Sequence, residues 1–369
     1  MPVRKLSLLI ICFFLASVSA VADDENDPIA RVRPWRNDVG RAAWSPKGDL
    51  IAFDKTGDDG YSDLFLIRPD GTLEDCLTCH RLEFRKRHVG DPAWHPSGRY
   101  LVFQVSKPFE RGGKPFPFLG VPGRNLGNDL WAINLEQRKY WQLTNTTERG
   151  GRVLSAAFSR EGDQLAWSER VASSGTWGQW VIRTGRFEHS SKVLRVKGVK
   201  TLKPGHRGSF YEIYGFSADD RSLLIGGTLA EEQPIHGMDL YKVSLRDEQP
   251  VALTESPTQW DRFGSFAPNG EWLIWSTNRD IHERGPGIAR GETSAAKPFD
   301  LWWAKGDGSG ARRLTRFNDP LSDTYAGLVM VGPTTWSPAG DRLLTLITPV
   351  DDPTQGSLFL IELDQPYGR

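Results

Sequence analysis

The chain has 369 residues, and its 46 basic and 46 acidic side chains give a formal net charge of zero. This balance lacks the excess positive charge of a general nucleic-acid binder, so we expect no nucleic-acid partner. With 38 Gly, 24 Pro and 14 Trp, the composition favours many short strands and turns over long helices.

The first residues have the pattern of an export signal. Arg4 and Lys5 precede a short apolar run, 6–18, and small residues follow it. The run is too short to span a bilayer comfortably, and no later segment is apolar enough for a membrane span. We therefore predict a signal peptide at 1–22 and a periplasmic or secreted mature chain at 23–369.

Six copies of one pattern follow along the chain. Each has an aromatic residue, a polar turn with Pro or Gly, and then alternating apolar residues, which is typical of a β-hairpin. The aromatic positions are Trp44, Trp94, Phe158, Phe216, Phe266 and Trp336. A third strand follows each hairpin, and a fourth often ends in Leu-Thr. Four strands per copy, repeated six times, predict an all-β, six-bladed β-propeller of four-stranded antiparallel blades.

The last copy has no fourth strand of its own before the chain ends at Arg369. The strand-like segment 29–35 precedes the first copy, and we predict that it pairs beside 357–363. Such pairing closes the ring and removes open sheet edges. We interpret four aspartates that begin equivalent third strands as structural, bonded to backbone there: Asp63, Asp129, Asp239 and Asp300.

Hairpins such as 42–54, the Asp-Leu third strands and the Leu-Thr endings resemble the TolB-like family of WD-type repeat propellers. The resemblance covers about residues 29–369. It implies a six-bladed propeller and a periplasmic setting. TolB itself carries an α/β domain before its propeller, and peptidase relatives carry a hydrolase domain. We expect neither here, so the resemblance does not transfer TolB's role with the peptidoglycan-associated lipoprotein.

The connections of the expected propeller are unequal. The long ones, 106–128, 196–212, 278–299 and 316–333, should emerge on one face, whereas the opposite face should have short turns. Long ordered loops on a rigid scaffold often carry binding sites. We therefore predict a non-catalytic binding or scaffold protein that recognises a protein, peptide or glycan partner of the cell envelope on this face. We also expect the protein to be a monomer.

Two basic segments, 80–88 and 195–207, link consecutive blades in this scheme and could form an anion-binding rim. The alternative is a pair of solvated loops. The candidate ligand-binding residues are Arg85, Lys86, Arg87, His88, Lys203, His206 and Arg207.

Cys76 and Cys79 are the two cysteines left after signal removal, and export favours a disulfide between them. Their spacing from His80 also matches the attachment signature of c-type haem. A metal site that adds His80 or His88 is a further alternative. Because Leu77-Thr78 occupies the regular strand-ending position, the sequence favours the disulfide, with no cofactor and no metal; haem c remains the alternative cofactor.

Catalytic motifs are sparse. The chain contains neither G-x-S-x-G nor H-E-x-x-H. His206, His236 and His282 fall in expected long loops, so a propeller hydrolase or lyase is an alternative function, but no residue is assigned as catalytic.

Overall fold

The computed structural model describes residues 28–108, 127–172, 178–256, 258–281, 297–352 and 354–368. The predicted signal peptide, 1–22, lies outside the described residues. So do most of the long connections 106–128 and 278–299, including His282.

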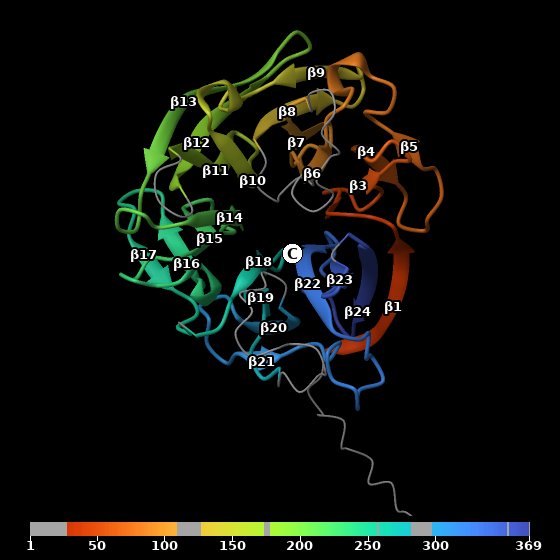
Figure 1. Cartoon of the computed structure of the whole chain (residues 1–369), viewed down its shortest axis with the longest axis vertical. Helices are drawn as coiled ribbons and strands as arrows, with labels where there is room; N and C mark the ends of the chain where they lie inside the picture. The colour runs from red at the N-terminus through yellow and green to blue at the C-terminus, as the bar shows by residue number, and fades with distance from the viewer. Residues whose placement is uncertain are drawn as a thin grey trace, which may run out of the picture.

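Six four-stranded sheets surround a central axis in a closed ring (Figure 1). All sheet pairs are antiparallel, and the helical elements of the described residues are three short 3₁₀ turns: Leu82–Phe84, Thr147–Arg149 and Ile235–Gly237. The predicted six-bladed propeller is therefore confirmed. Among the described residues, no helix has the length and apolar character needed to cross a membrane.

The two inner strands of every blade are the hairpins predicted from the repeats. The innermost strands are β2 (Ala42–Trp44), β6 (Val89–Trp94), β10 (Arg152–Phe158), β14 (Tyr211–Phe216), β18 (Arg262–Phe266) and β22 (Val329–Trp336). The second strands are β3 (Ile51–Thr56), β7 (Tyr100–Ser106), β11 (Gln164–Ala172), β15 (Ser222–Gly227), β19 (Trp272–Thr277) and β23 (Arg342–Pro349).

The two outer strands complete each blade. The third strands are β4 (Ser62–Ile67), β8 (Asn128–Asn134), β12 (Gln179–His189), β16 (Asp239–Ser244), β20 (Asp300–Lys305) and β24 (Ser357–Leu363). The outermost strands are β5 (Asp75–Cys76), β9 (Lys139–Gln142), β13 (Leu194–Leu202), β17 (Pro250–Ala252), β21 (Arg312–Arg313) and β1 (Ile29–Asn37).

The amino-terminal strand β1 closes the ring, as predicted. It pairs antiparallel with β24, so that Val32 faces Ile361 and Arg36 faces Leu358. In Figure 1 the red β1 lies beside the dark blue β24. The sixth blade therefore joins residues from both ends of the described chain.

The hydrophobic core lies between neighbouring blades. Along β7, Leu101 and Phe103 belong to the cluster shared with blade 1, whereas Val102 belongs to the cluster shared with blade 3. Successive side chains of a strand point to opposite faces of its sheet. A strand that is buried on both faces therefore reads as a continuous apolar run, as residues 100–103 do.

A repeated bond between Asp and Thr explains the Asp-Leu and Leu-Thr motifs. The Thr315 hydroxyl donates to Asp300 Oδ1 (2.9 Å) and accepts the amide N–H of Leu301 (2.9 Å), and the amide of Phe317 donates to the same carboxylate (2.8 Å). The hydroxyl-to-carboxylate bond recurs in Thr78–Asp63, Thr144–Asp129 and Thr254–Asp239. These aspartates are structural, as the sequence indicated.

Blade 3 departs from the sequence prediction. Its outermost strand β13 runs from Leu194 to Leu202, and its third strand β12 extends to His189. Residues 196–202, expected in a long loop, are therefore part of the sheet. Likewise 329–333, the end of the expected loop 316–333, belongs to β22. The extra chain length is thus divided between loops and longer strands.

Candidate functional site

Strand direction alternates within each blade, so the linkers between blades and the connections between second and third strands emerge on one face. We call this the long-loop face, and the opposite side the short-turn face. Among the described residues, the long-loop face includes the linkers 77–88, 203–210 and 314–328.

The two most exposed large apolar side chains of the described residues lie in linkers of this face. Leu321 is 95% exposed and Leu82 is 82% exposed. Tyr325, in the same linker as Leu321, is also exposed. Clusters of exposed apolar side chains on a soluble protein mark surfaces that contact other molecules.

Leu82 is presented by a linker that is fixed at both sides. Cys76 and Cys79 form a disulfide with their Cα atoms 5.7 Å apart, which confirms the predicted bond. Phe84 is buried and packs edge-on against Trp131, with ring centroids 5.4 Å apart. Leu82 lies between these two anchors, so its backbone is already restrained. Binding a partner through Leu82 therefore costs little further conformational entropy.

The candidate ligand-binding residues of this linker differ in their exposure to solvent. Arg85 and Lys86 are exposed and Arg87 is half-buried. His88, in contrast, is 1% exposed, and its Nδ1 accepts the amide N–H of Ser62 (3.2 Å). Burial lowers the pKa of His88 to about 4, because its charged form is poorly solvated there. The expectation that His88 belongs to an exposed rim was wrong.

The second basic segment lies elsewhere on the ring. Lys203, His206 and Arg207 are exposed in the linker after β13, and both imidazole nitrogens of His206 contact carbonyl oxygens, those of Arg207 and Ala230, at 3.0 Å. The linkers after β5 and after β13 are on different sides of the ring in Figure 1. The structure therefore does not join the two segments into one site.

Charged side chains from four blades meet at the central axis, near the ends of the inner strands that face the long-loop side. Arg41 pairs with Asp91 (2.9 Å), and Arg262 pairs with the buried carboxylate of Glu212 (2.8 Å). Burial alone would lower the pKa of Arg41, but Asp91 and Glu212 raise it. The Phe263 ring lies under both guanidinium groups, 4.3 Å from that of Arg262 and 5.7 Å from that of Arg41.

Sequence reasoning missed this cluster, although a signal was present. Arg41 and Asp91 stand three residues before the repeat aromatics Trp44 and Trp94, and Glu212 and Arg262 occupy the related positions in later copies. A charge at the start of a buried inner strand needs a partner. Glu212 Oε1 is a buried oxygen with no hydrogen-bond donor among the described residues, so the cluster offers an acceptor to a further group.

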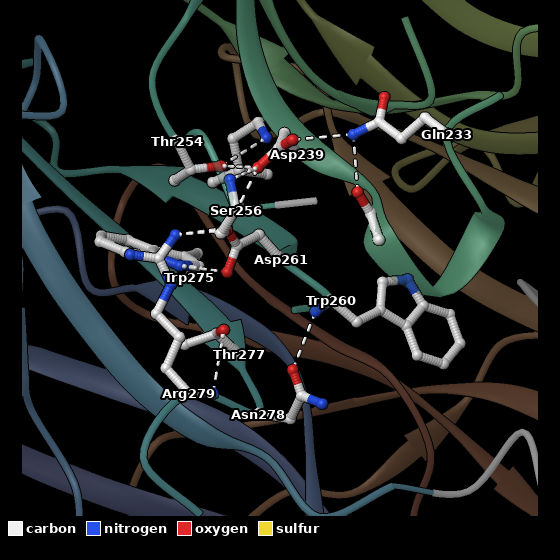
Figure 2. A network of polar contacts seen from close by, with 12 residues as sticks. Gln233, Asp239, Thr254, Ser256, Trp260, Asp261, Trp275, Thr277, Asn278 and Arg279 are labelled. Carbon is white, nitrogen blue, oxygen red and sulfur yellow. Dashed lines mark hydrogen bonds and ion pairs between the residues drawn. The ribbon is translucent and has the colours of Figure 1, made fainter. Parts of the chain in front are cut away.

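A polar network fixes the linker between blades 4 and 5 beside this cluster (Figure 2). The amide N–H of Ser256 donates to Asp239 (2.8 Å), and its hydroxyl donates to Asp261 (2.6 Å). The guanidinium of Arg279 pairs with the fully buried Asp261 (2.7 Å). The amide of Trp260 donates to Asn278 (2.8 Å). The linker is therefore held by charge-assisted bonds at several points.

His236, one of the histidines of the enzyme alternative, packs against this linker. Its ring centroid lies 4.5 Å from that of Trp260, and Arg262 lies over the same indole at 4.8 Å. Burial lowers the pKa of His236, and the charges of Lys297 and Arg262 lower it further. His236 is therefore placed by aromatic packing at the edge of the central cluster.

Metal-ligating side chains gather at one place in the described part of the chain, around Asp63, Cys76 and Cys79. The two sulfur atoms are bonded to each other there, whereas thiolates are the form that binds metals. Haem attachment would likewise need both thiols. His80 stands next to the bridge with a backbone φ of 60°.

Comparison with known proteins gives a limited set of similarities. The sequence matches no protein-family model. A 77-residue segment, 21% of this chain, is 39% identical to the Tol-Pal system protein TolB of Gluconobacter oxydans (strain 621H) and spans 16% of that relative's length.

Two solved structures are similar to the chain at low sequence identity. TolB from Acinetobacter baumannii has a TM-score of 0.49 and 13% identity, over 90% of this chain and 64% of that one. An oligogalacturonate lyase in complex with manganese has a TM-score of 0.47 and 10% identity, over 90% of each chain. The two have unlike names, so this similarity says nothing about activity.

The ring, its strand order and its repeats define the class: the chain is a six-bladed β-propeller. Within that class, the repeat motifs resemble those of TolB-like propellers, and a 77-residue segment of the chain is similar to a TolB.

Proposed function

We propose that the chain is an exported binding protein that recognises a protein partner of the cell envelope on its long-loop face. One observation carries the proposal: Leu82 and Leu321, the two most exposed large apolar side chains in the part of the chain that the structure describes, lie in linkers of that same face. Protein partners commonly bury a few such side chains as anchors within a polar surround.

The exposed cations of the first linker support the same surface. Arg85 and Lys86 stand beside Leu82, and an acidic rim on a partner would complement them. The export signal predicted from sequence and the similarity to a relative named as a Tol-Pal system protein support a periplasmic or secreted location. A monomeric propeller is the simplest arrangement that leaves this face open.

The test is capture of envelope proteins by the tagged chain after chemical crosslinking, followed by mass spectrometry. Leu82→Ser and the pair Arg85→Glu/Lys86→Glu should each reduce recovery of the same partner by about fivefold or more. Leu73→Ser is the matched control, because Leu73 is 63% exposed in the turn between β4 and β5, on the short-turn face.

Equal recovery by the wild type, the long-loop variants and the control would contradict the proposal. Loss only with Leu73→Ser would move the binding surface to the opposite face.

A further inference from the structure

The outer hairpin of blade 3 concentrates positive charge in a chain that is neutral overall. Between residues 179 and 202 there is one acidic residue, Glu188. The basic residues of the same hairpin are Arg183, Arg186, Lys192, Arg195, Lys197 and Lys200. Such a local excess attracts anionic molecules even when the whole chain carries no net charge.

A β-bulge aligns these cations on one face of the sheet. Arg195, Lys197 and Lys200 pair with Glu188, Arg186 and Thr184 of β12, three partners that alternate regularly. Regular alternation would place the Lys200 side chain on the opposite face of the sheet from that of Lys197, because successive side chains of a strand point to opposite faces. The extra residue at Gly198–Val199, where Gly198 has φ +61°, restores Lys200 to the face of Lys197.

The single acidic residue neutralises only part of this row. Glu188 bonds to Arg186 (2.7 Å), Arg195 (2.8 Å) and Lys197 (3.3 Å). These bonds lower the pKa of Glu188 to about 2, so it is ionised at neutral pH. Lys200 is exposed and takes part in none of the ion pairs found among the described residues.

The cations line a groove between blades 3 and 4 with a volume of about 770 Å³. One wall carries Arg186, Lys197 and Lys200 from the hairpin, together with the hydroxyl-bearing Thr184 and Thr201. The other wall is the turn between β16 and β17, which contributes the exposed Arg246 and also Glu248. Asp163 lines the groove as well, so its four cationic side chains outnumber its two carboxylates. Because the turn between β16 and β17 joins a third to a fourth strand, the groove opens toward the short-turn side, away from the surface proposed above.

We propose that this groove binds an acidic polysaccharide, a linear polymer that carries carboxylate, sulfate or phosphate groups at regular intervals. The aligned cations are spaced along a strand by about 7 Å per pair of residues, which suits repeated anionic groups. The threonine hydroxyls can bond to sugar hydroxyls, and the lysine and arginine side chains supply donors to the anions.

Two other polyanions fit the groove less well. An acidic peptide would add to β13 as a further strand, but the bulge at Gly198–Val199 interrupts the regular edge that such pairing needs. Single-stranded nucleic acid is usually held by stacking of its bases on aromatic side chains. The groove lining has no aromatic residue.

The experiment measures binding of the whole exported chain to three probe polymers at about 50 mM salt, where charge screening is weak. The probes are polygalacturonate, heparin and polyphosphate, which carry carboxylate, sulfate and phosphate; neutral dextran is the blank. Lys200→Glu/Arg246→Glu should weaken binding of at least one polysaccharide probe by about tenfold or more. Arg68→Glu/Lys305→Glu makes the same change of net charge at two exposed residues outside the groove and should leave binding within about twofold.

Several outcomes would overturn the inference. These are the absence of polysaccharide binding, equal loss with both variant pairs, and tighter binding of polyphosphate or single-stranded DNA than of either acidic polysaccharide. Lys200 and Arg246 are exposed, so an unchanged thermal midpoint verifies the fold of that variant. The outcome is independent of the protein-capture test, because the two surfaces use different variants and different readouts.

Discussion

Asp54 is a buried carboxylate enclosed by the backbone of two blades. It is 2% exposed, and its Oδ2 accepts the amide N–H of Asp91 (3.0 Å). A Cβ atom at Gly40 would lie 1.7 Å from Asp54 Oδ1, and one at Gly90 would lie 2.4 Å from Oδ2. Glycine at these two positions therefore makes room for the carboxylate beside the central charged cluster.

Burial raises the pKa of Asp54 from 3.8 to about 7, and the nearby charge of Asp91 adds to the effect. The folded state then binds the proton more tightly than the unfolded state, so the free energy of unfolding falls as pH rises between these two values. Ionisation of this one carboxyl group lowers the free energy of unfolding by at most about 4 kcal/mol.

We expect Asp54→Asn to remove most of this pH dependence. The amide oxygen of Asn can still accept the N–H of Asp91, and it carries no charge to desolvate. Urea unfolding at several pH values from 4 to 8 should therefore show the variant gaining stability relative to the wild type as pH rises.

Asp307→Asn provides the control for that series. The pKa of the exposed Asp307 is lowered by its bonds to Ser309, so its carboxylate favours the folded state and its contribution is lost only as pH falls. From pH 5 to 8, the free energy of unfolding of this variant should not increase relative to that of the wild type. Parallel pH profiles for Asp54→Asn and the wild type would contradict the role given to burial.

At the scale of single elements, the linker after β5 combines a disulfide with an exposed apolar residue. The bridge joins Cys76 to Cys79 across a separation of three residues, so it closes a very small loop. In the chain-entropy account, such a loop contributes at most about 2 kcal/mol. Replacing both residues, Cys76→Ser/Cys79→Ser, should therefore leave the ring folded, with only a small decrease in thermal midpoint.

The effect of this variant should be local. Faster amide hydrogen exchange is expected in 77–87 and not in the blades, because the bridge restrains the start of this linker. The intact mass of the wild type should be lower than the reduced chain by two hydrogen atoms. A mass increase equal to a haem would instead support the c-type alternative, and global unfolding of the double variant would show that the bridge stabilises more than its linker.

Strand positions were predictable because they depend on local patterns. The aromatic and turn residues of each copy, such as Trp44 and Trp336, mark hairpins, and the Asp-Leu and Leu-Thr motifs mark a bond that recurs between the third strand and the chain that follows the fourth. The closing strand β1 was also predictable, since a blade with three strands leaves one position to fill.

The extension of β13 was not predictable from the same patterns. Gly and Lys are disfavoured in strands, so 197–200 had the composition of a loop. The strand continues because the bulge at Gly198–Val199 keeps the register that buries Leu202. His88 was misplaced for a related reason: whether the residue before β6 is buried depends on packing against Ser62 of the neighbouring blade, a non-local contact.

The central charged cluster was hidden for a reason that belongs to the whole ring. Arg41 and Glu212 belong to blades 1 and 4, and only closure of the ring brings their strands to a common axis. Each charge alone looks like an exposed residue at a strand start. The sequence repeat therefore locates the blades, whereas the geometry of the complete ring determines which side chains meet.

Ring closure through β1 has a thermodynamic consequence, because the core lies between blades. Opening the sixth blade exposes apolar side chains of two clusters. Val32 of β1 packs in the cluster that contains Ile361 of β24, and Trp35 of β1 packs in the cluster that contains Leu358 of β24. A covalent bond between β1 and β24 would prevent this opening and would also shorten the unfolded chain into a loop that contains almost every described residue.

We therefore predict that Arg31→Cys/Glu362→Cys, two residues that face each other across this pair, forms a disulfide that stabilises the protein by as much as about 5 kcal/mol. The measurement is denaturant unfolding of the oxidised and reduced forms, with each single variant as a control for loss of the original side chain. The reduced double variant should unfold like the single variants, and only its oxidised form should unfold at higher denaturant. If the oxidised and reduced forms unfolded together, separation of β1 from β24 would not be part of the unfolding transition, and the ring would be held by its other five blades.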